Sequence, residues 1–208
     1  MSIYVLAGTN GAGKSSIGGA MIRAAGADYF NPDEAARQIV EANPGVSIAE
    51  ANSAAWLEGK RLLERATAEH GNFAFETTLG GATMTRMLGD AIDAGIDVHI
   101  WYVALKSPEL HLARVRERVS GGGHDIPERD VRRRYDASRQ NLLELLHGLA
   151  SLRVYDNSAN ADPVAGAAPA PELLLHMERR RIVYHCNLAT APEWVKPILL
   201  TALRDPGE

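Results

Sequence analysis

The sequence predicts an α/β protein in which a parallel sheet is covered by helices on both faces. Short apolar runs typical of buried strands alternate along the chain with longer segments that have helical periodicity. The apolar runs are continuous rather than alternating, which is typical of parallel strands buried on both faces. With 208 residues, 46% of them hydrophobic, the chain is long enough for a sizeable core, and we expect one domain over residues 1–208.

The first half of the chain predicts three strands and four helices. Asn31 has the side chain of an N-cap with Pro32 at the first helical position, and Ser47 and Glu50 have capping-box spacing. Glycines at 26, 71 and 95 mark where helices end. We therefore predict strands at Ile3–Ala7, Asp28–Asn31 and Phe73–Phe75, and helices at Ser15–Ala25, from Pro32, from Ser47 to about Glu69 and at Ala82–Ala94.

The second half continues the alternation and then changes character. Val98–Leu105 is the clearest strand, and helices are predicted at Pro108–Val119 and Pro127–Leu149, before a strand at Leu152–Tyr155. Residues 159–171 are rich in Ala and Pro and predict an irregular connection. We treat about 159–208 as a C-terminal extension, with a helix near Glu172–Glu178, a strand near Ile182–Tyr184 and a helix at about Pro192–Leu203.

Composition argues against several classes of protein. The net charge of −4 disfavours a nucleic-acid partner, because such proteins usually carry a basic excess. No apolar run approaches the roughly 18 residues of a membrane span, and no secretory pattern precedes Ile3. The single cysteine, Cys186, allows no internal disulfide. We expect a cytoplasmic protein with no membrane or nucleic-acid partner.

A glycine-rich segment after the first strand predicts a phosphate-binding loop. It matches the Walker A pattern G-x-x-x-x-G-K-[ST] and lies between a predicted strand and a predicted helix. Backbone N–H groups and the helix N-terminus would face the phosphates of ATP, Lys14 would reach the β- and γ-phosphates, and the Ser15 hydroxyl would ligand Mg²⁺. The expected nucleotide-binding residues are Gly8, Thr9, Asn10, Gly11, Ala12, Gly13, Lys14, Ser15 and Ser16.

Two carboxylates follow predicted strands, at the sheet edge where ligands of α/β proteins collect. Asp33 follows the second strand and is our candidate for the base that accepts a proton from an acceptor hydroxyl. Its alternative role is to stabilise the first turn of its helix, worth about 0.3–1 kcal/mol. Glu76 is expected to hold an acceptor hydroxyl, a magnesium-bound water or the phosphate loop. Thr77 and Thr78 either bind the acceptor or simply favour a strand end.

An arginine-rich segment predicts a lid at about residues 109–139. Of the 18 arginines, 8 lie in this segment together with 6 acidic residues. Arg114 and Arg118 share one helix face, and Arg134 lies on a second helix beyond the glycine hinge 121–123. Such helices would close over a nucleotide, exclude water and neutralise the transferring phosphoryl group. The alternative is a solvated face of salt-bridged helices, and His124 is expected to be a loop residue.

Seven motifs together resemble the zeta-toxin-like kinases, in their compact bacterial branch labelled as predicted ATPases. They span residues 3 to 158 in the expected order. The motifs are Gly8–Ser16, Asn31-Pro32-Asp33, Phe75-Glu76-Thr77-Thr78-Leu79, Arg114-Val115-x-x-Arg118-Val119, Gly122-Gly123-His124-x-Ile126-Pro127, Arg134-Tyr135 and Tyr155-Asp156-Asn157-Ser158.

The resemblance implies a P-loop NTPase fold with a nucleotide-kinase-like, five-stranded parallel sheet. It further implies use of ATP and Mg²⁺, 3′-phosphorylation of UDP-N-acetylglucosamine, and neutralisation by a small antitoxin protein. Carried over by motif, Asp33 would be the base, Glu76 and Thr78 would hold the substrate, Arg118 and Arg134 would contact phosphate, and Asn157 would lie near the adenine.

Two alternative functions stay open on the sequence. One keeps the kinase chemistry and changes the acceptor to another nucleotide, such as NAD, or to a metabolite. The other is an ATP-binding regulatory module without transfer.

Overall fold

The computed structural model describes residues 1–14, 29–121, 125–159 and 170–204. Within these ranges the strands are β1 (Ser2–Ala7), β2 (Tyr29–Phe30), β3 (Phe73–Thr77), β4 (Asp97–Ala104), β5 (Ser151–Asp156), β6 (Glu172–Glu178) and β7 (Arg181–His185). The helices are α3 (Pro32–Ala42), α4 (Ile48–Ala68), α5 (Ala82–Asp93), α6 (Pro108–Ser120), α7 (Glu128–Leu145) and α8 (Lys196–Arg204), with a 3-10 turn at Leu146–Gly148.

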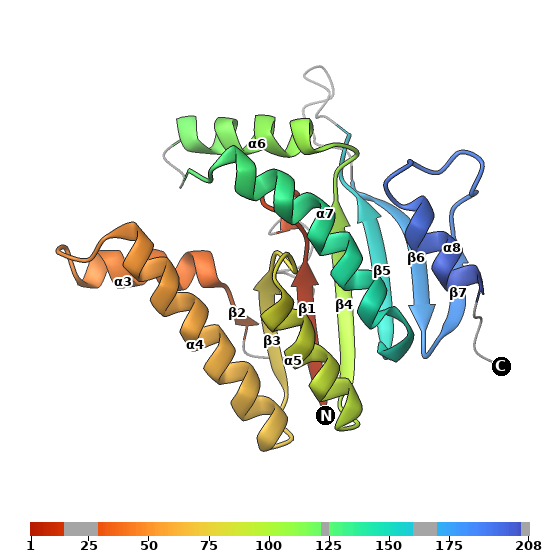
Figure 1. Ribbon diagram of the computed structural model, residues 1–208, viewed down its shortest axis with the longest axis horizontal. Coiled ribbons are helices and arrows are strands. Elements are labelled where there is room, and N and C mark those ends of the chain that lie inside the picture. Colours follow the sequence, from red (N-terminus) through yellow and green to blue (C-terminus); the bar gives the residue numbers. More distant parts are fainter. Residues whose placement is uncertain (15–28, 122–124, 160–169, 205–208) are drawn as a thin grey trace.

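The described strands form one mostly parallel sheet in the order β2-β3-β1-β4-β5-β6-β7 (Figure 1). β1 lies between β3 and β4, and β1 to β5 are parallel, which confirms the predicted α/β class. The five-stranded expectation is wrong, since β6 and β7 extend the sheet to seven strands within the described ranges. Both added strands pair antiparallel.

The predicted helix near Glu172–Glu178 is also wrong, because these residues form β6. Leucine, glutamate and methionine favour helices in isolation, but intrinsic propensity is weak and tertiary context overrides it. Here β5 offers a row of backbone donors and acceptors, and β6 pairs with it along its length. Ser151 lies opposite Glu178 at one end, and Asp156 lies opposite Glu172 at the other. The sequence contains no local signal of that partner.

Most helix starts agree with the capping signals. The Asn31 side chain accepts from the backbone N–H groups of Asp33 at 2.9 Å and Glu34 at 3.3 Å. Ser47 and Glu50 form the expected capping box. The last helix begins at Lys196 rather than Pro192. The predicted helix Ser15–Ala25 lies outside the described residues.

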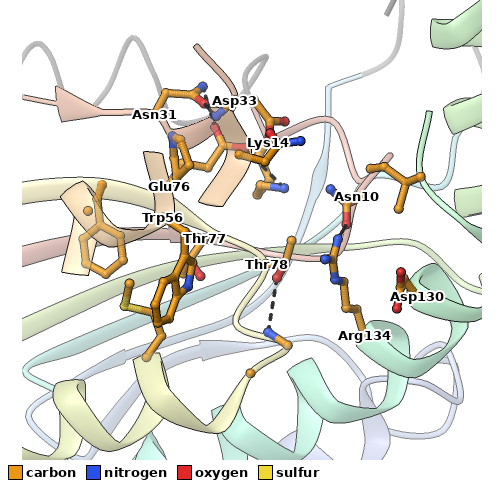
Figure 2. A pocket seen from close by; sticks show the side chains of 18 of the residues that line it. Asn10, Lys14, Asn31, Asp33, Trp56, Glu76, Thr77, Thr78, Asp130 and Arg134 are labelled. Carbon is orange, nitrogen blue, oxygen red and sulfur yellow. Dashed lines mark hydrogen bonds and ion pairs between the residues drawn. The ribbon is translucent and has the colours of Figure 1, made fainter. Parts of the chain in front are cut away.

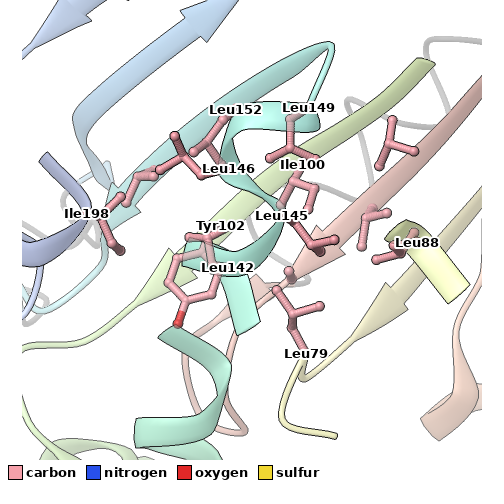
Figure 3. Close-up of a cluster of buried hydrophobic side chains, with 14 of the residues drawn as sticks. Leu79, Leu88, Ile100, Tyr102, Leu142, Leu145, Leu146, Leu149, Leu152 and Ile198 are labelled. Carbon is pink, nitrogen blue, oxygen red and sulfur yellow. The ribbon is translucent and has the colours of Figure 1, made fainter. Parts of the chain in front are cut away.

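The main core lies between the sheet and the helices α5, α7 and α8, which cover one face (Figure 1). Figure 3 shows leucines of α5 and α7 packed on β4 and β5 around the ring of Tyr102, whose hydroxyl bonds the Ser138 hydroxyl at 3.1 Å. The opposite face of the strands carries a smaller cluster, made of Leu6, Ala12, Ala74, Trp101 and Val103.

This packing brings the carboxyl ends of β1, β3 and β4 together below α6 (Figure 1). The loop after β1 and the turn after β3 therefore lie side by side, tied by the bond from the Gly8 N–H to the Thr77 carbonyl at 3.2 Å. In the part of the chain that the structure describes, no helix is long and apolar enough to cross a membrane.

Candidate active site

The loop Gly8–Lys14 lies tightly against two neighbouring elements. A Cβ atom on Gly8, whose φ is +144°, would lie 2.1 Å from the carbonyl oxygen of Val103 on β4. A Cβ on Gly11, whose φ is +80°, would lie 2.7 Å from the carbonyl oxygen of His111 on α6. Both positions require glycine, because other residues rarely adopt these angles and have no room here. The loop therefore keeps the close backbone approach that a phosphate cradle needs.

Lys14 ends this loop as a buried cation with only 7% of its surface exposed. Its Nζ donates to the Gly8 carbonyl at 2.7 Å and lies 3.3 Å from Oε1 of Glu76. The other Glu76 oxygen accepts from the Tyr29 hydroxyl at 2.8 Å and from the Asn31 amide at 3.2 Å. Glu76 thus joins the end of β3 to the phosphate loop and to the start of α3.

Asp33 lies in the first turn of α3 and lines a cavity of about 470 Å³ together with Lys14, Glu76 and Arg134 (Figure 2). The N-cap Asn31 fixes this turn, since its amide nitrogen bonds Glu76 while its oxygen accepts from Asp33. Oδ2 of Asp33 lies 3.9 Å from a guanidinium nitrogen of Arg118 across the cleft. Both side chains are exposed, so this pair contributes little stability.

Arg134 approaches the cavity from α7 and contacts the phosphate loop directly. Its Nη1 donates to Oδ1 of Asn10 at 2.8 Å (Figure 2). Its carbonyl accepts from the Thr9 hydroxyl at 3.3 Å. Burial lowers the pKa of Arg134, while the carboxylates of Asp130 and Asp33 oppose that effect. A partly desolvated cation beside the loop interacts more strongly with a bound anion than an exposed one would.

The turn after β3 forms the floor of the same cavity. The Thr77 hydroxyl accepts from the Leu79 N–H at 3.1 Å, and the Thr78 hydroxyl accepts from the Gly80 N–H at 3.4 Å. Helix α7 holds this turn, because the amide of Asn141 donates to the Leu79 carbonyl at 2.7 Å. Both threonines therefore cap the turn and line the cavity at the same time.

The remaining predicted residues that the structure describes do not line the smaller cavity. Arg114 and Arg118 line a second cavity of about 960 Å³, which shares Lys14, Asp33 and Glu76 with the smaller one. The Arg114 guanidinium donates to the Ala159 carbonyl at 3.2 Å. The Asn157 amide donates to the Ala12 carbonyl at 2.9 Å. Ser15, Ser16 and the loop 122–124 with His124 lie outside the described residues.

A sequence model described as Zeta toxin matches residues 2–162. The chain belongs to the zeta-toxin family. An uncharacterized protein of Haemophilus influenzae is 34% identical over 132 residues, which cover 62% of this chain and 88% of that protein.

Solved structures similar to this zeta-toxin family member show the same fold at low identity. The complex AvrRxo1-ORF1:-ORF2 with ATP has a TM-score of 0.67 at 14% identity, covering 97% of this chain and 63% of that chain. The chain thus spans less than two thirds of that solved protein. The PezAT toxin–antitoxin system of Streptococcus pneumoniae has a TM-score of 0.52 at 16% identity, covering 75% of this chain and 68% of that one.

Three cavity residues of this family member on α4 were not predicted. Asn52, Trp56 and Gly59 are spaced i, i+4 and i+7, so they share the helix face that borders the 470 Å³ cavity. The neighbouring face, with Ala51 and Ala55, packs against α3. The signal was present in the sequence: a tryptophan one turn after an asparagine, beside a face of small residues. Trp56 is 42% exposed and forms one wall of the cavity (Figure 2).

A further unpredicted residue, His111 on α6, contacts the loop and is fully buried. Its Nδ1 lies 2.8 Å from the Asn10 carbonyl oxygen, so Nδ1 carries the proton that is donated. Burial lowers the pKa of His111 to about 4; the Asn10 carbonyl opposes this, and the cations Lys14, Arg114 and Arg139 add to it. The neutral ring thus serves the loop as a fixed donor.

We expect His111 to make stability depend on pH. Its pKa is about 4 in the folded protein and 6.5 ordinarily, so its stabilising effect is complete above pH 6.5 and is lost as the pH falls toward 4. The loss totals about 3 kcal/mol, at about 1.4 kcal/mol per pH unit. Urea unfolding between pH 7 and pH 4 measures it.

The variant His111→Asn keeps a side-chain N–H donor but does not titrate, so its stability should fall less steeply over this window. His70→Asn is the matched control, since His70 is exposed at the surface and its φ of 50° suits asparagine. Parallel pH curves for His111→Asn and the wild-type protein would contradict this interpretation.

Proposed function

We propose that the protein is an ATP- and Mg²⁺-dependent phosphotransferase that moves the γ-phosphate of ATP to a hydroxyl of a small molecule. One observation carries this proposal: the phosphate-loop cation Lys14, the carboxylate of Asp33 and the guanidinium of Arg134 line a single cavity. Membership of the zeta-toxin family and the fold shared with an ATP-bound structure support it.

The residues present suit a nucleoside triphosphate with magnesium. The loop offers a buried ammonium, and Arg134 adds a second cation at its rim. Mg²⁺ takes oxygen ligands and keeps several waters, so it needs one or two protein oxygens beside the phosphates rather than a full protein cage. Within the described ranges, no cluster of three or more His, Cys, Asp or Glu is placed to bind a metal. Ser15 remains our proposed ligand.

Each charged residue then has a distinct role in transfer. When bound, ATP supplies the phosphoryl group and Mg²⁺ supplies positive charge beside it. Asp33 accepts the proton of the acceptor hydroxyl while the hydroxyl oxygen forms a bond to the γ-phosphorus of ATP. The bond between the γ-phosphorus and the oxygen bridging to the β-phosphate breaks, and ADP leaves. Lys14 and Arg134 stabilise the charge that develops on the phosphoryl oxygens, and Arg118 joins them when the proposed lid 109–139 closes.

The cavity also suggests the character of the acceptor. Phe30, Trp56 and Met84 provide apolar walls, while Asn52, Thr77 and Thr78 provide polar groups in the same cavity as Asp33. This mixture is typical of sites for small polar ligands that carry a ring. UDP-N-acetylglucosamine is therefore the first acceptor to test, and NAD the second. Because two similar structures are a two-protein complex and a toxin–antitoxin system, a small antitoxin is the proposed partner, and the cytoplasm is the proposed location.

Incubation with ATP labelled at the γ-phosphate and separate acceptors tests the proposal. We expect label to move to UDP-N-acetylglucosamine. Transfer to NAD or another metabolite instead would retain the phosphotransferase and replace the acceptor. ATP binding without transfer to any acceptor, in protein freed of any bound partner, would contradict the proposal. That result would favour the regulatory-module alternative.

A further inference from the structure

The C-terminal extension lies beyond the part of the chain that the family match covers. The match ends at residue 162, whereas β6, β7 and α8 follow it. The edge of the sheet formed by β6 and β7 is far from α3 and α4, which border the acceptor cavity (Figure 1). The phosphate-site residues described above all precede residue 162, so the family match alone gives no role in the reaction to the extension.

One side chain of this extension nevertheless reaches the strand that supports the nucleotide site. Trp194 lies between β7 and α8 and is 6% exposed. Its indole N–H donates to Oδ2 of Asp156 at 2.7 Å, a buried bond. Asp156 is the last residue of β5, and its carboxylate is buried as well. A buried carboxylate needs such donors, because leaving it unpaired is costly.

Asp156 in turn organises the turn Asp156–Ser158. Its Oδ1 accepts from the Ser158 N–H at 2.6 Å, and the Ser158 hydroxyl accepts from the Lys106 N–H at 2.7 Å. The Asn157 N–H donates to the Ala104 carbonyl at 3.0 Å. These bonds hold the turn against the end of β4, with both carboxylate oxygens of Asp156 engaged.

The turn then contacts the phosphate loop. The Asn157 side-chain amide donates to the carbonyl of Ala12 at 2.9 Å, and Ala12 is fully buried in that loop. Two hydrogen bonds, from Trp194 to Asp156 and from Asn157 to Ala12, are therefore joined by the peptide bond between Asp156 and Asn157. Residues within one hydrogen-bond network are the ones whose substitutions couple energetically.

We propose that Trp194 is a positioning residue for nucleotide binding, acting through Asp156 and the Asp156–Ser158 turn on the phosphate loop. Strands β6 and β7 and helix α8 are then part of the nucleotide-binding apparatus rather than an added layer of packing. The inference rests on the proposed use of ATP at this loop and adds to it a dependence on residues outside the family match.

The test compares two tryptophans of this chain. Trp194→Phe keeps an aromatic ring and removes the N–H that bonds Asp156. Trp101→Phe makes the same chemical change at a residue 9% exposed, whose indole N–H has no hydrogen-bond partner among the described residues. Affinity for the ATP analogue AMP-PNP with Mg²⁺ is measured by calorimetry, and the Tm of each variant is measured by calorimetric scanning without ligand.

We expect Trp194→Phe to weaken AMP-PNP binding about tenfold, within the range of coupling in hydrogen-bond networks, and Trp101→Phe to leave it within about twofold. Both are expected to lower Tm. Equal affinities of the two variants would overturn the inference, because a purely structural role for Trp194 predicts loss of Tm alone. If wild-type protein fails to bind AMP-PNP, the proposed function fails, and this inference fails with it.

Asp156→Asn approaches the same bond from the other side and serves if Trp194→Phe does not fold. Its amide has one acceptor oxygen in place of two, so it cannot accept from both the Trp194 indole and the Ser158 N–H, and AMP-PNP affinity should again fall about tenfold. The double variant should bind about as weakly as either single variant. Losses that simply multiply in the double variant would show that Trp194 does not act through Asp156, and would overturn the proposal.

Discussion

Replacing Asp33 with asparagine is expected to lower kcat for phosphoryl transfer by about 10²- to 10⁴-fold, the usual contribution of a general base. The amide is nearly the same size as the carboxylate but cannot accept the proton of the acceptor hydroxyl. Affinity for ATP should stay within a few-fold, because Lys14 and the loop are unchanged. Rapid-quench assays with labelled ATP and the accepted hydroxyl compound measure kcat, and calorimetry measures ATP affinity.

Glu34→Gln is the matched control for this prediction. Glu34 occupies the same first turn, and its N–H bonds the same Asn31 cap, but its side chain does not line the cavity. If Asp33 served only to stabilise that turn, the two variants would behave alike and lose about 0.3–1 kcal/mol of stability. A kcat for Asp33→Asn equal to that of Glu34→Gln would remove Asp33 from the mechanism.

Replacing Lys14 with methionine should have a comparable effect on activity and a separate effect on folding. Loss of one preorganised cation from the phosphate site is expected to reduce kcat by about 10²- to 10³-fold and to weaken ATP binding. It also leaves Glu76 buried without its ion-pair partner, which should cost on the order of 3 kcal/mol of unfolding free energy. Urea unfolding and labelled-ATP transfer measure the two effects independently.

A double variant separates these two effects. Lys14→Met combined with Glu76→Gln leaves no unpaired buried charge, so stability should largely return while transfer stays low. Lys60→Met is a surface control, since Lys60 pairs with Glu64 at 3.1 Å on the exposed side of α4 and its loss should cost at most about 1 kcal/mol. Recovery of transfer in the double variant would show that Lys14 acts on folding alone.

The sequence predicted the parallel strands and the helix starts because their signals are local. Asn31 and Ser47 lie within a few residues of the N–H groups they cap, and buried strands such as β4 are continuous apolar runs. It failed at β6, where the deciding contact is the open edge of β5, more than a dozen residues away along the chain. Propensity alone favoured a helix there.

The candidate site shows the same division between local and distant information. Glycine spacing predicted the loop Gly8–Lys14, and the ends of predicted strands pointed to Asp33 and Glu76. What each side chain contacts was not readable, because the contacts join distant segments: Glu76 meets Lys14 across 62 positions, and Arg134 meets Asn10 across 124. Trp56 is the exception, because its i, i+4, i+7 spacing with Asn52 and Gly59 places all three on the one face of α4 that borders the cavity.

The distribution of tryptophans gives the protein an internal optical reporter. Of its three indoles, those of Trp101 and Trp194 are buried and that of Trp56 is 42% exposed at the cavity wall. A diffusing quencher such as acrylamide therefore collides mainly with the fluorophore beside the proposed acceptor cavity. A ligand in that cavity should lower the fraction of tryptophan emission that acrylamide quenches. Candidate acceptors can therefore be ranked in solution, with unlabelled protein, before any product is detected.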